Sequence, residues 1–247
     1  MLVAAALPAM PEVRAGDDLA ALLVEAAGML ADGDVLVVAH KVVSKAEGRT
    51  VALSEVEPGG RARELAAEHG KDARLVEVIL AESEEIVRSR PGVLICRTRH
   101  GFVCANAGVD ASNAGAAGEL VLLPVDPDAS ARALRARLRT IAGAAPAIVI
   151  ADSFGRAWRI GQCDVAIGIA GLAPVADWRG REDGAGRPLE STIVAVADEA
   201  AAAADLTRGK DSREPAVLLR GLERFVTEGD GPGAAALVRA RDEDLFL

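Results

Sequence analysis

Short runs of β-branched residues alternate along this chain with longer segments rich in alanine and leucine. Short apolar runs are typical of buried strands, and alanine- and leucine-rich segments are typical of helices. The alternation therefore favours an α+β (mixed α/β) fold over a β-sandwich or a helical bundle. Seven segments are expected to be strands: 34–43, 92–98, 119–125, 147–151, 164–171, 192–197 and 216–220.

Helices are predicted where a capping residue precedes apolar residues at helical spacing. An aspartate pair, 17–18, precedes an apolar stripe over 19–30. Asp126 followed by Pro127 is typical of a helix start, with an N-cap before a first-turn proline. The alanine-rich segment 198–209 is expected to be a third helix that closes at its final glycine.

The segment 177–191 interrupts this rhythm with three glycines, a proline and charges of both signs. It is expected to be a long ordered loop or a mobile lid.

The length of 247 residues allows one large domain or two small lobes, and either can bury a substantial core. No apolar run reaches the roughly 18 to 20 residues that span a bilayer. Pro8 and Pro11 interrupt the N-terminal segment before a signal-peptide pattern is complete. We therefore expect a cytoplasmic protein with no membrane partner.

Acidic residues outnumber basic ones, with 37 Asp and Glu against 28 Lys and Arg and a net charge of −9. Nucleic-acid backbones need a cationic face, so no nucleic-acid partner is expected. A small anionic ligand would have to be met by locally placed cations or metal. The three cysteines lack CxxC spacing and the three histidines lack HxxxH or HxH spacing, which argues against a disulfide framework and a zinc site.

The loop HGFVCANAGVDASN, residues 100–113, gathers polar side chains between apolar segments. Asn106, Asp110 and Asn113 supply a carboxylate and two amides, the oxygen ligands that Mg²⁺ accepts when phosphate completes its shell. An Asx-rich turn that satisfies its own backbone is an equally good interpretation of the loop alone.

A second polar group follows the predicted strand 147–151. Asp152 and Ser153 are expected at its carboxyl end, the usual place for ligands in α/β sheets, where a carboxylate and a hydroxyl can hold a divalent cation. Arg156 and Arg159 follow closely and could bind carboxylate or phosphate bidentately. The alternative is an exposed turn with a surface ion pair.

Two further segments carry cations beside predicted elements. Ser44 and Lys45 follow the strand predicted over 34–43 and could contact phosphate, although GxxxxGK[ST] is absent. Gly209 and Lys210 follow a predicted helix and could contact a phosphate or a purine. Taken alone, a solvated charged strand end is the simpler explanation of the first segment, and an ordinary glycine cap with a solvent-exposed lysine is the default explanation of the second.

Four ordered motifs carry a family resemblance: HKVVSKAEGR, TRHGFVCANAGVDASN, DSFGRAWRIGQCDVAIGIAG and GRPLESTIVAVADEAAAAADL. Together they resemble the coenzyme F420-0:L-glutamate ligase family, whose members add glutamate to the lactyl carboxylate of a deazaflavin cofactor. The resemblance covers most of the chain. Cys163 and Ala157 depart from the pattern, which has threonine or serine and proline there, but neither replaces a supposed ligand.

The resemblance implies a gamma-glutamyl ligase-like fold, with two interlocked lobes around a cleft in an intertwined homodimer, and a single catalytic unit over 1–247. It implies coenzyme F420-0, L-glutamate and GTP as substrates. It also implies two divalent ions, Mg²⁺ or Mn²⁺, and admits K⁺.

The same resemblance assigns roles to particular residues. Asp110, Asp152 and Ser153 match metal ligands. The charge neutralisation that such a reaction needs, rather than a motif match, makes Lys45, Arg156 and Arg159 the catalytic candidates, the two arginines as holders of a glutamate or cofactor carboxylate. The expected GTP contacts are Leu7, Pro8, Ala9, Met10, Ser44, Lys45, Asn113, Gly209 and Lys210.

Two other functional classes use the same residues. A metal-dependent phosphohydrolase or phosphotransferase would need these aspartates and cations without forming an amide. A non-catalytic nucleotide- or deazaflavin-binding module would bind without turnover.

Overall fold

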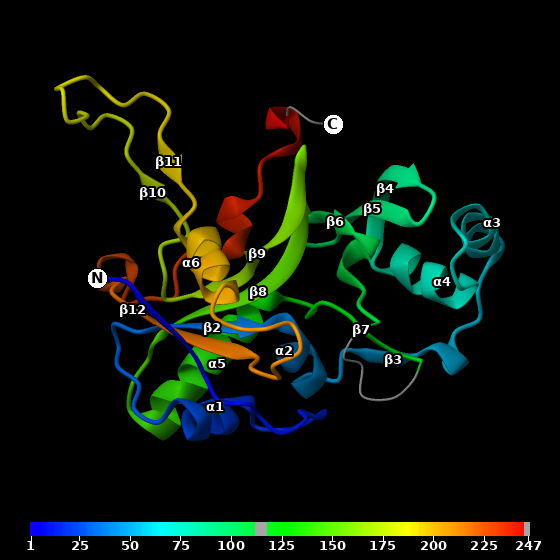
Figure 1. The fold of residues 1–247 in the computed structure, drawn as a ribbon, viewed down its shortest axis with the longest axis horizontal. Helices are drawn as coiled ribbons and strands as arrows, with labels where there is room; N and C mark the ends of the chain where they lie inside the picture. The colour runs from blue at the N-terminus through cyan, green and yellow to red at the C-terminus, as the bar shows by residue number, and fades with distance from the viewer. Residues whose placement is uncertain (112–117, 245–247) are drawn as a thin grey trace.

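The computed structural model describes residues 1–111 and 118–244, and it confirms a mixed α/β fold. A five-stranded sheet forms the centre of the molecule (Figure 1). Its strands β2 and β8 are parallel, and the other neighbouring pairs are antiparallel. In spatial order the strands are β1 (Val3–Ala6), β12 (Ala216–Arg220), β2 (Val35–Ala39), β8 (Ala147–Arg156) and β9 (Arg159–Ala170).

Helices cover both faces of this sheet and make three layers. Because successive strand side chains point to opposite faces, Leu36 and Val38 belong to one apolar cluster, while Val35 and Val37 belong to another. The first cluster packs against α1 (Leu19–Ala27) and α5 (Pro127–Ala142), and the second against α6 (Val196–Asp205).

A second part of the molecule is built from the chain between α2 (His40–Ala46) and α5, and it lies beside the central sheet (Figure 1). A three-stranded sheet and two helices share an apolar cluster that includes Leu65, Ile79 and Leu94. The elements are β3 (Thr50–Ala52), α3 (Gly60–His69), α4 (Ala73–Ala81), β4 (Ser83–Arg90), β5 (Val93–Thr98), β6 (Val103–Ala105) and β7 (Glu119–Val121). Five short 3-10 turns complete the described chain: Leu53–Glu55, Asn106–Gly108, Glu223–Phe225, Ala234–Leu237 and Arg241–Glu243.

The helix starts predicted from capping residues are confirmed. The Asp18 carboxylate accepts the backbone N–H of Ala21 at the start of α1. The Asp126 carboxylate accepts the N–H of Ala129, and Pro127 occupies the first turn of α5. The strand predicted over 216–220 is β12.

The strand predicted over 34–43 is wrong beyond Ala39, because helix α2 (His40–Ala46) begins there. Val43 and Ala46 lie at helical spacing and pack onto the cluster beneath α1. An apolar run of this length does not distinguish a strand from a buried helix, and tertiary packing decided between them.

Other predicted boundaries also shift. Of the strand predicted over 192–197, only β11 (Ile193–Val194) is a strand. Helix α6 begins at Val196, because the alanines that follow lie at helical spacing and pack on the sheet. Helix α6 ends at Asp205 rather than Gly209. The strand predicted over 119–125 ends at Val121. The strands predicted over 147–151 and 164–171 continue into one long β8–β9 hairpin.

The segment 177–191, predicted as a loop or lid, belongs to a two-stranded arm that comprises residues 176–194. Strand β10 (Ala176–Asp177) pairs with β11, and an isolated bridge joins Glu182 and Pro188 farther out. The arm extends away from the central sheet (Figure 1). No helix among residues 1–111 and 118–244 is both long and apolar enough to cross a membrane.

Candidate functional site

Helix α2 carries three side chains that contact separate parts of the chain. His40, 1% exposed, places Nε2 3.3 Å from Asp152 Oδ1. Lys41 forms an ion pair with Asp110 of the 100–113 loop. Lys45 forms an ion pair with Glu12 of the N-terminal segment. One short helix therefore connects two predicted metal ligands and the predicted nucleotide-binding N-terminus.

Sheet register explains why His40 meets Asp152. In the parallel β2–β8 pair, Ala39 is opposite Ala151. The next residues are His40 and Asp152, so both side chains leave the sheet at the same edge. There β2 turns into α2, whereas β8 continues as a hairpin with β9. Asp152 is thus inside a strand but at the carboxyl end of its parallel portion, where ligands usually bind.

Ser153 belongs to a buried polar cluster with Asp164 at its centre. The two residues are opposite each other in the β8–β9 register, and Ser153 Oγ donates to Asp164 Oδ1 at 2.5 Å. Arg208 Nη2 donates to Asp164 Oδ2 at 2.8 Å, and Lys210 Nζ donates to Ser153 Oγ at 2.9 Å. The segment after α6 is thereby attached to the strand that carries Asp152.

Lys210 carries a positive charge in this cluster. Partial burial lowers its pKa, but the hydrogen bond to Asp205 at 2.7 Å and the charge of Asp164 outweigh that effect. The pKa of Lys210 is therefore raised above its ordinary value. The ammonium remains a cation at neutral pH, as a phosphate contact requires.

The N-terminal segment Leu7–Met10 lies beside the chain that follows Lys210. Leu7 N–H donates to Ala216 O at 2.9 Å, and Met10 N–H donates to Arg213 O at 3.3 Å. Leu7 and Met10 are buried, whereas Pro8 and Ala9 are exposed. The structure thus places these two predicted nucleotide-binding segments side by side. Of the other predicted nucleotide contacts, Gly209 directly precedes Lys210, and the buried Ser44 directly precedes Lys45 on α2.

The described part of the predicted loop, residues 100–111, contains strand β6, a strained turn and a backbone bridge to Val121. Asn106 and Ala107 have φ values of 53° and 54°, in the left-handed region that is uncommon for residues other than glycine. Asp110 exchanges backbone hydrogen bonds with Val121. Asn106 Oδ1 is buried and has no hydrogen-bond partner among the described residues. Asn113, a predicted GTP contact, lies outside the described residues.

Arg156 and Arg159 lie apart from the polar cluster around Asp164, at the tip of the β8–β9 hairpin. Arg156 lies four positions after Asp152, which is about 13 Å along a strand. Arg156 donates to the carbonyls of Ile160 and Gly161, and Trp158 between the arginines is 82% exposed. Their catalytic assignment stays a prediction.

Four side chains that contact the predicted site residues, or the partner of one, were not predicted from sequence: His40, Lys41, Asp164 and Arg208. A regular hairpin turning at Ala157–Trp158 would place Gln162 opposite Ser153, and the register shift between Gly155 and Arg156 brings Asp164 there instead. Nor does a local signal exist for His40, whose position beside Asp152 depends on the register of two strands distant in sequence.

The described residues suit a divalent ion that arrives with phosphate rather than one enclosed by protein ligands. Within residues 1–111 and 118–244, no three His, Cys, Asp or Glu side chains gather as a metal-binding group. Asp152 and Ser153 nevertheless offer adjacent oxygen ligands, and Mg²⁺ commonly needs only one or two carboxylates beside substrate phosphates. His40 Nε2 is buried without a hydrogen-bond partner in the described chain and lies within 3.3 Å of Asp152. Such a group can orient a ligating carboxylate.

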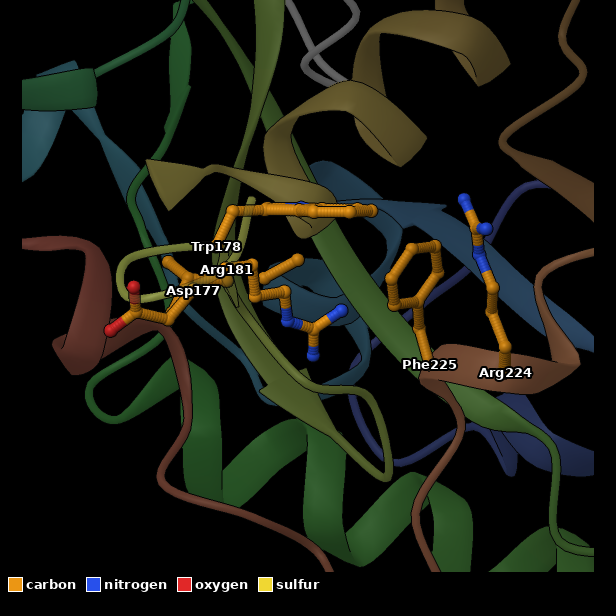
Figure 2. Close-up of a pocket in the computed structure, with 7 residues that line it drawn as sticks. Asp177, Trp178, Arg181, Arg224 and Phe225 are labelled. Atoms are coloured by element: carbon orange, nitrogen blue, oxygen red, sulfur yellow. The ribbon is translucent and has the colours of Figure 1, made fainter. Parts of the chain in front are cut away.

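A hollow of about 290 Å³ lies at the base of the arm, and none of the predicted site residues lines it. Figure 2 shows Arg181 beneath the Trp178 ring and Arg224 beside Phe225. The guanidinium of Arg181 lies 4.9 Å from the Trp178 ring centre, and that of Arg224 lies 4.5 Å from the Phe225 ring centre.

Comparison with known proteins gives consistent matches over nearly the whole chain. A family model described as F420-0:Gamma-glutamyl ligase matches residues 9–221. The coenzyme F420:L-glutamate ligase of Methanopyrus kandleri is 49% identical over 242 residues, covering 97% of this chain and 95% of the relative. The protein of that name from Methanothermobacter thermautotrophicus is 46% identical, covering 96% and 95%. The one from Haloarcula marismortui is 44% identical, covering 97% and 93%.

Proposed function

Because the chain belongs to the F420-0:gamma-glutamyl ligase family, we propose that it is a GTP-dependent cytoplasmic ligase. It joins L-glutamate to the lactyl carboxylate of coenzyme F420-0, and further γ-linked glutamates can follow. Mg²⁺ or Mn²⁺ assists the reaction, and K⁺ is included as a further cation.

One observation beyond family membership supports this proposal. Segments distant in sequence meet around Asp152 and Ser153: helix α2 through His40, and the segment after α6 through Lys210. The N-terminal segment adjoins both, through the ion pair of Glu12 with Lys45 and the backbone bond from Met10 to Arg213. A carboxylate and a hydroxyl with cations placed beside them are what an anionic substrate and its metal ion need in a chain with a net charge of −9.

The chemistry requires activation because a carboxylate is a poor electrophile. In the proposed first step, a carboxylate oxygen of F420-0 attacks the γ-phosphorus of GTP, the bond to the β-phosphate oxygen breaks, and GDP leaves. In the second step, the glutamate amine attacks the acyl carbon. Phosphate leaves, the nitrogen loses a proton, and the amide remains.

All reactants in the first step are anions, so charge neutralisation and positioning are the main catalytic demands. Lys45 and Lys210 are proposed to neutralise phosphoryl oxygens. Asp110, Asp152 and Ser153 are proposed to hold the divalent ions, which would supply charge stabilisation to the phosphates when bound. Arg156 and Arg159 are proposed to hold a carboxylate of glutamate or F420-0.

We also propose that the chain acts as an intertwined homodimer. The β10–β11 arm extends from the body and exposes Ile193 and Trp178, which suits burial against a second subunit. Light scattering after size-exclusion chromatography tests this, with deletion of residues 179–191 expected to yield monomers. A wild-type monomer would contradict it.

The ligase is tested by mass spectrometry of a mixture containing the protein, F420-0, L-glutamate, GTP, Mn²⁺ and K⁺. Parallel mixtures lack GTP or glutamate. A GTP-dependent mass gain of one or more glutamyl units is expected. GDP production without that gain would favour a phosphohydrolase, and binding without turnover would favour a nucleotide- or deazaflavin-binding module.

A further inference from the structure

The Ser153 hydroxyl has its hydrogen-bonding directions fixed by two partners. A serine hydroxyl has one proton to donate and two lone pairs that accept. Ser153 Oγ lies 2.5 Å from Asp164 Oδ1, and it accepts a hydrogen bond from Lys210 Nζ at 2.9 Å. Because an ionised carboxylate can only accept, the hydroxyl proton must point toward Asp164.

Asp164 is itself held firmly. It is 2% exposed, and Arg208, also largely buried, donates to its second oxygen at 2.8 Å. Arg208 further donates to the Pro215 carbonyl at 3.0 Å. Rotation of Asp164 toward solvent would therefore break the hydrogen bonds from Arg208 Nη2 and from the Ser153 hydroxyl, which is costly.

We propose that Asp164 is a positioning residue that directs the Ser153 hydroxyl proton away from the cation site. The proposal rests on the proposed function, in which Ser153 is a metal ligand. A hydroxyl binds a cation through an oxygen lone pair, so its proton must go to another acceptor. With the proton on the Asp164 side and one lone pair on Lys210, the remaining lone pair of Ser153 is available to the ion.

The same carboxylate connects the ligand to the nucleotide segment. Arg208 and Lys210 both approach Asp164, Lys210 Nζ at 3.5 Å from Oδ1. The orientation of Ser153 and the position of the segment after α6 are thus set by one buried group. Partners that orient a metal ligand in this way typically change metal affinity by about 10- to 100-fold when they are removed.

The test is a double-mutant cycle on Mn²⁺ affinity, measured by electron paramagnetic resonance with GDP present, so that no turnover is needed. The variants are Ser153→Ala, Asp164→Asn and the double variant. Each single change is expected to weaken Mn²⁺ binding about 10-fold or more. Asp164→Asn is expected to add less than about two-fold to Ser153→Ala, because it acts through the missing hydroxyl.

Asp198→Asn is the matched control. The Asp198 carboxylate accepts the backbone N–H of Ala166 on the same strand as Asp164, but it does not contact Ser153. Its Mn²⁺ affinity is expected within about two-fold of wild type. A general effect of neutralising a carboxylate that contacts β9 would affect both variants.

Three results would overturn the proposal: unchanged Mn²⁺ affinity in Ser153→Ala, unchanged affinity in a folded Asp164→Asn, or effects that multiply in the double variant. If Asp164→Asn fails to fold because Arg208 is left buried and unpaired, Asp164→Asn with Arg208→Gln replaces it. Ser153→Ala tests the same hydrogen bond without disturbing Arg208. If the wild type and the variants bind Mn²⁺·GDP with equal affinity, this inference alone is refuted. If the wild type does not bind Mn²⁺·GDP, the proposed metal site is refuted as well.

Discussion

His40 Nε2 lies 3.3 Å from Asp152 Oδ1, and both residues come one position after the paired alanines that end the parallel β2–β8 register. The imidazole is buried, and its Nε2 has no hydrogen bond to the described residues. The pair lies where the parallel register of β2 and β8 ends, with α2 on one side and the β8–β9 hairpin on the other.

Asp152→Asn should abolish glutamate addition while the protein remains folded. The change removes the charge of a proposed metal ligand at nearly constant volume, and only about 15% of this side chain is exposed. Product mass spectrometry measures the loss, and a melting temperature close to that of wild type excludes unfolding. Turnover like that of the wild type would contradict the metal role of Asp152.

Lys45→Ala should raise the KM for GTP by about 10- to 100-fold, with a smaller effect on F420-0. A charge-assisted hydrogen bond contributes about 1.5–3 kcal/mol, which sets this range. Steady-state kinetics with each substrate varied in turn measure the two effects.

Lys71→Ala is the matched control for Lys45→Ala. Lys71 is a half-exposed lysine between α3 and α4, away from the cluster. Its GTP kinetics should equal those of the wild type. Equal KM values for GTP in Lys45→Ala and Lys71→Ala would argue against a nucleotide contact by Lys45.

Gly168→Ala should destabilise the protein by about 1–3 kcal/mol or more, because its new Cβ would collide with the Pro127 carbonyl at the start of α5. For a chain of this size each kcal/mol lowers Tm by about 2–4 °C. Gly155→Ala is the control on the neighbouring strand, where a Cβ meets no atom within 4 Å. Calorimetry should separate the two variants, and equal Tm values would mean that α5 shifts freely.

The stability of the fold should fall at alkaline pH because of Cys104. Burial raises the pKa of this thiol from 9.0 to about 12. The unfolded thiol therefore loses its proton first, so the native state is favoured fully below pH 9 and loses free energy as the pH rises toward 12. The loss is about 1.4 kcal/mol per pH unit within that window.

Urea unfolding of wild type and Cys104→Ala at pH 8, 9, 10 and 11 measures this contribution. The alanine variant lacks the thiol, so its free energy of unfolding should fall less steeply above pH 9. Parallel pH dependences for the two proteins would show that Cys104 ionises equally in both states.

Local features of the sequence predicted much of the framework. Asp126 and Pro127 predicted the start of α5, because a cap and a first-turn proline act on the backbone within one helical turn. The apolar run 216–220 predicted β12, because both faces of that strand are buried. The motif around Asp152 and Ser153 predicted a polar site after a buried strand, and the family resemblance is confirmed by the comparisons.

Features that depend on pairing between distant segments were not predictable in this way. The run 34–43 has apolar residues on both sides of His40 and Lys41, so its division into β2 and α2 at His40 required packing against α1 and the sheet. The position of Leu7–Met10 beside Arg213–Ala216 follows from backbone hydrogen bonds across the sheet edge. Neither has a local sequence signal.

The sequence by itself determined which chemical groups this protein possesses and several of the strands and helices that carry them, because composition, caps and motifs act over a few neighbouring residues. The tertiary structure decided which of those groups meet. Asp164 became the partner of Ser153 through the hairpin register, and His40 became the neighbour of Asp152 through parallel strand pairing. Those contacts depend on hydrogen bonding and burial between segments far apart in the chain.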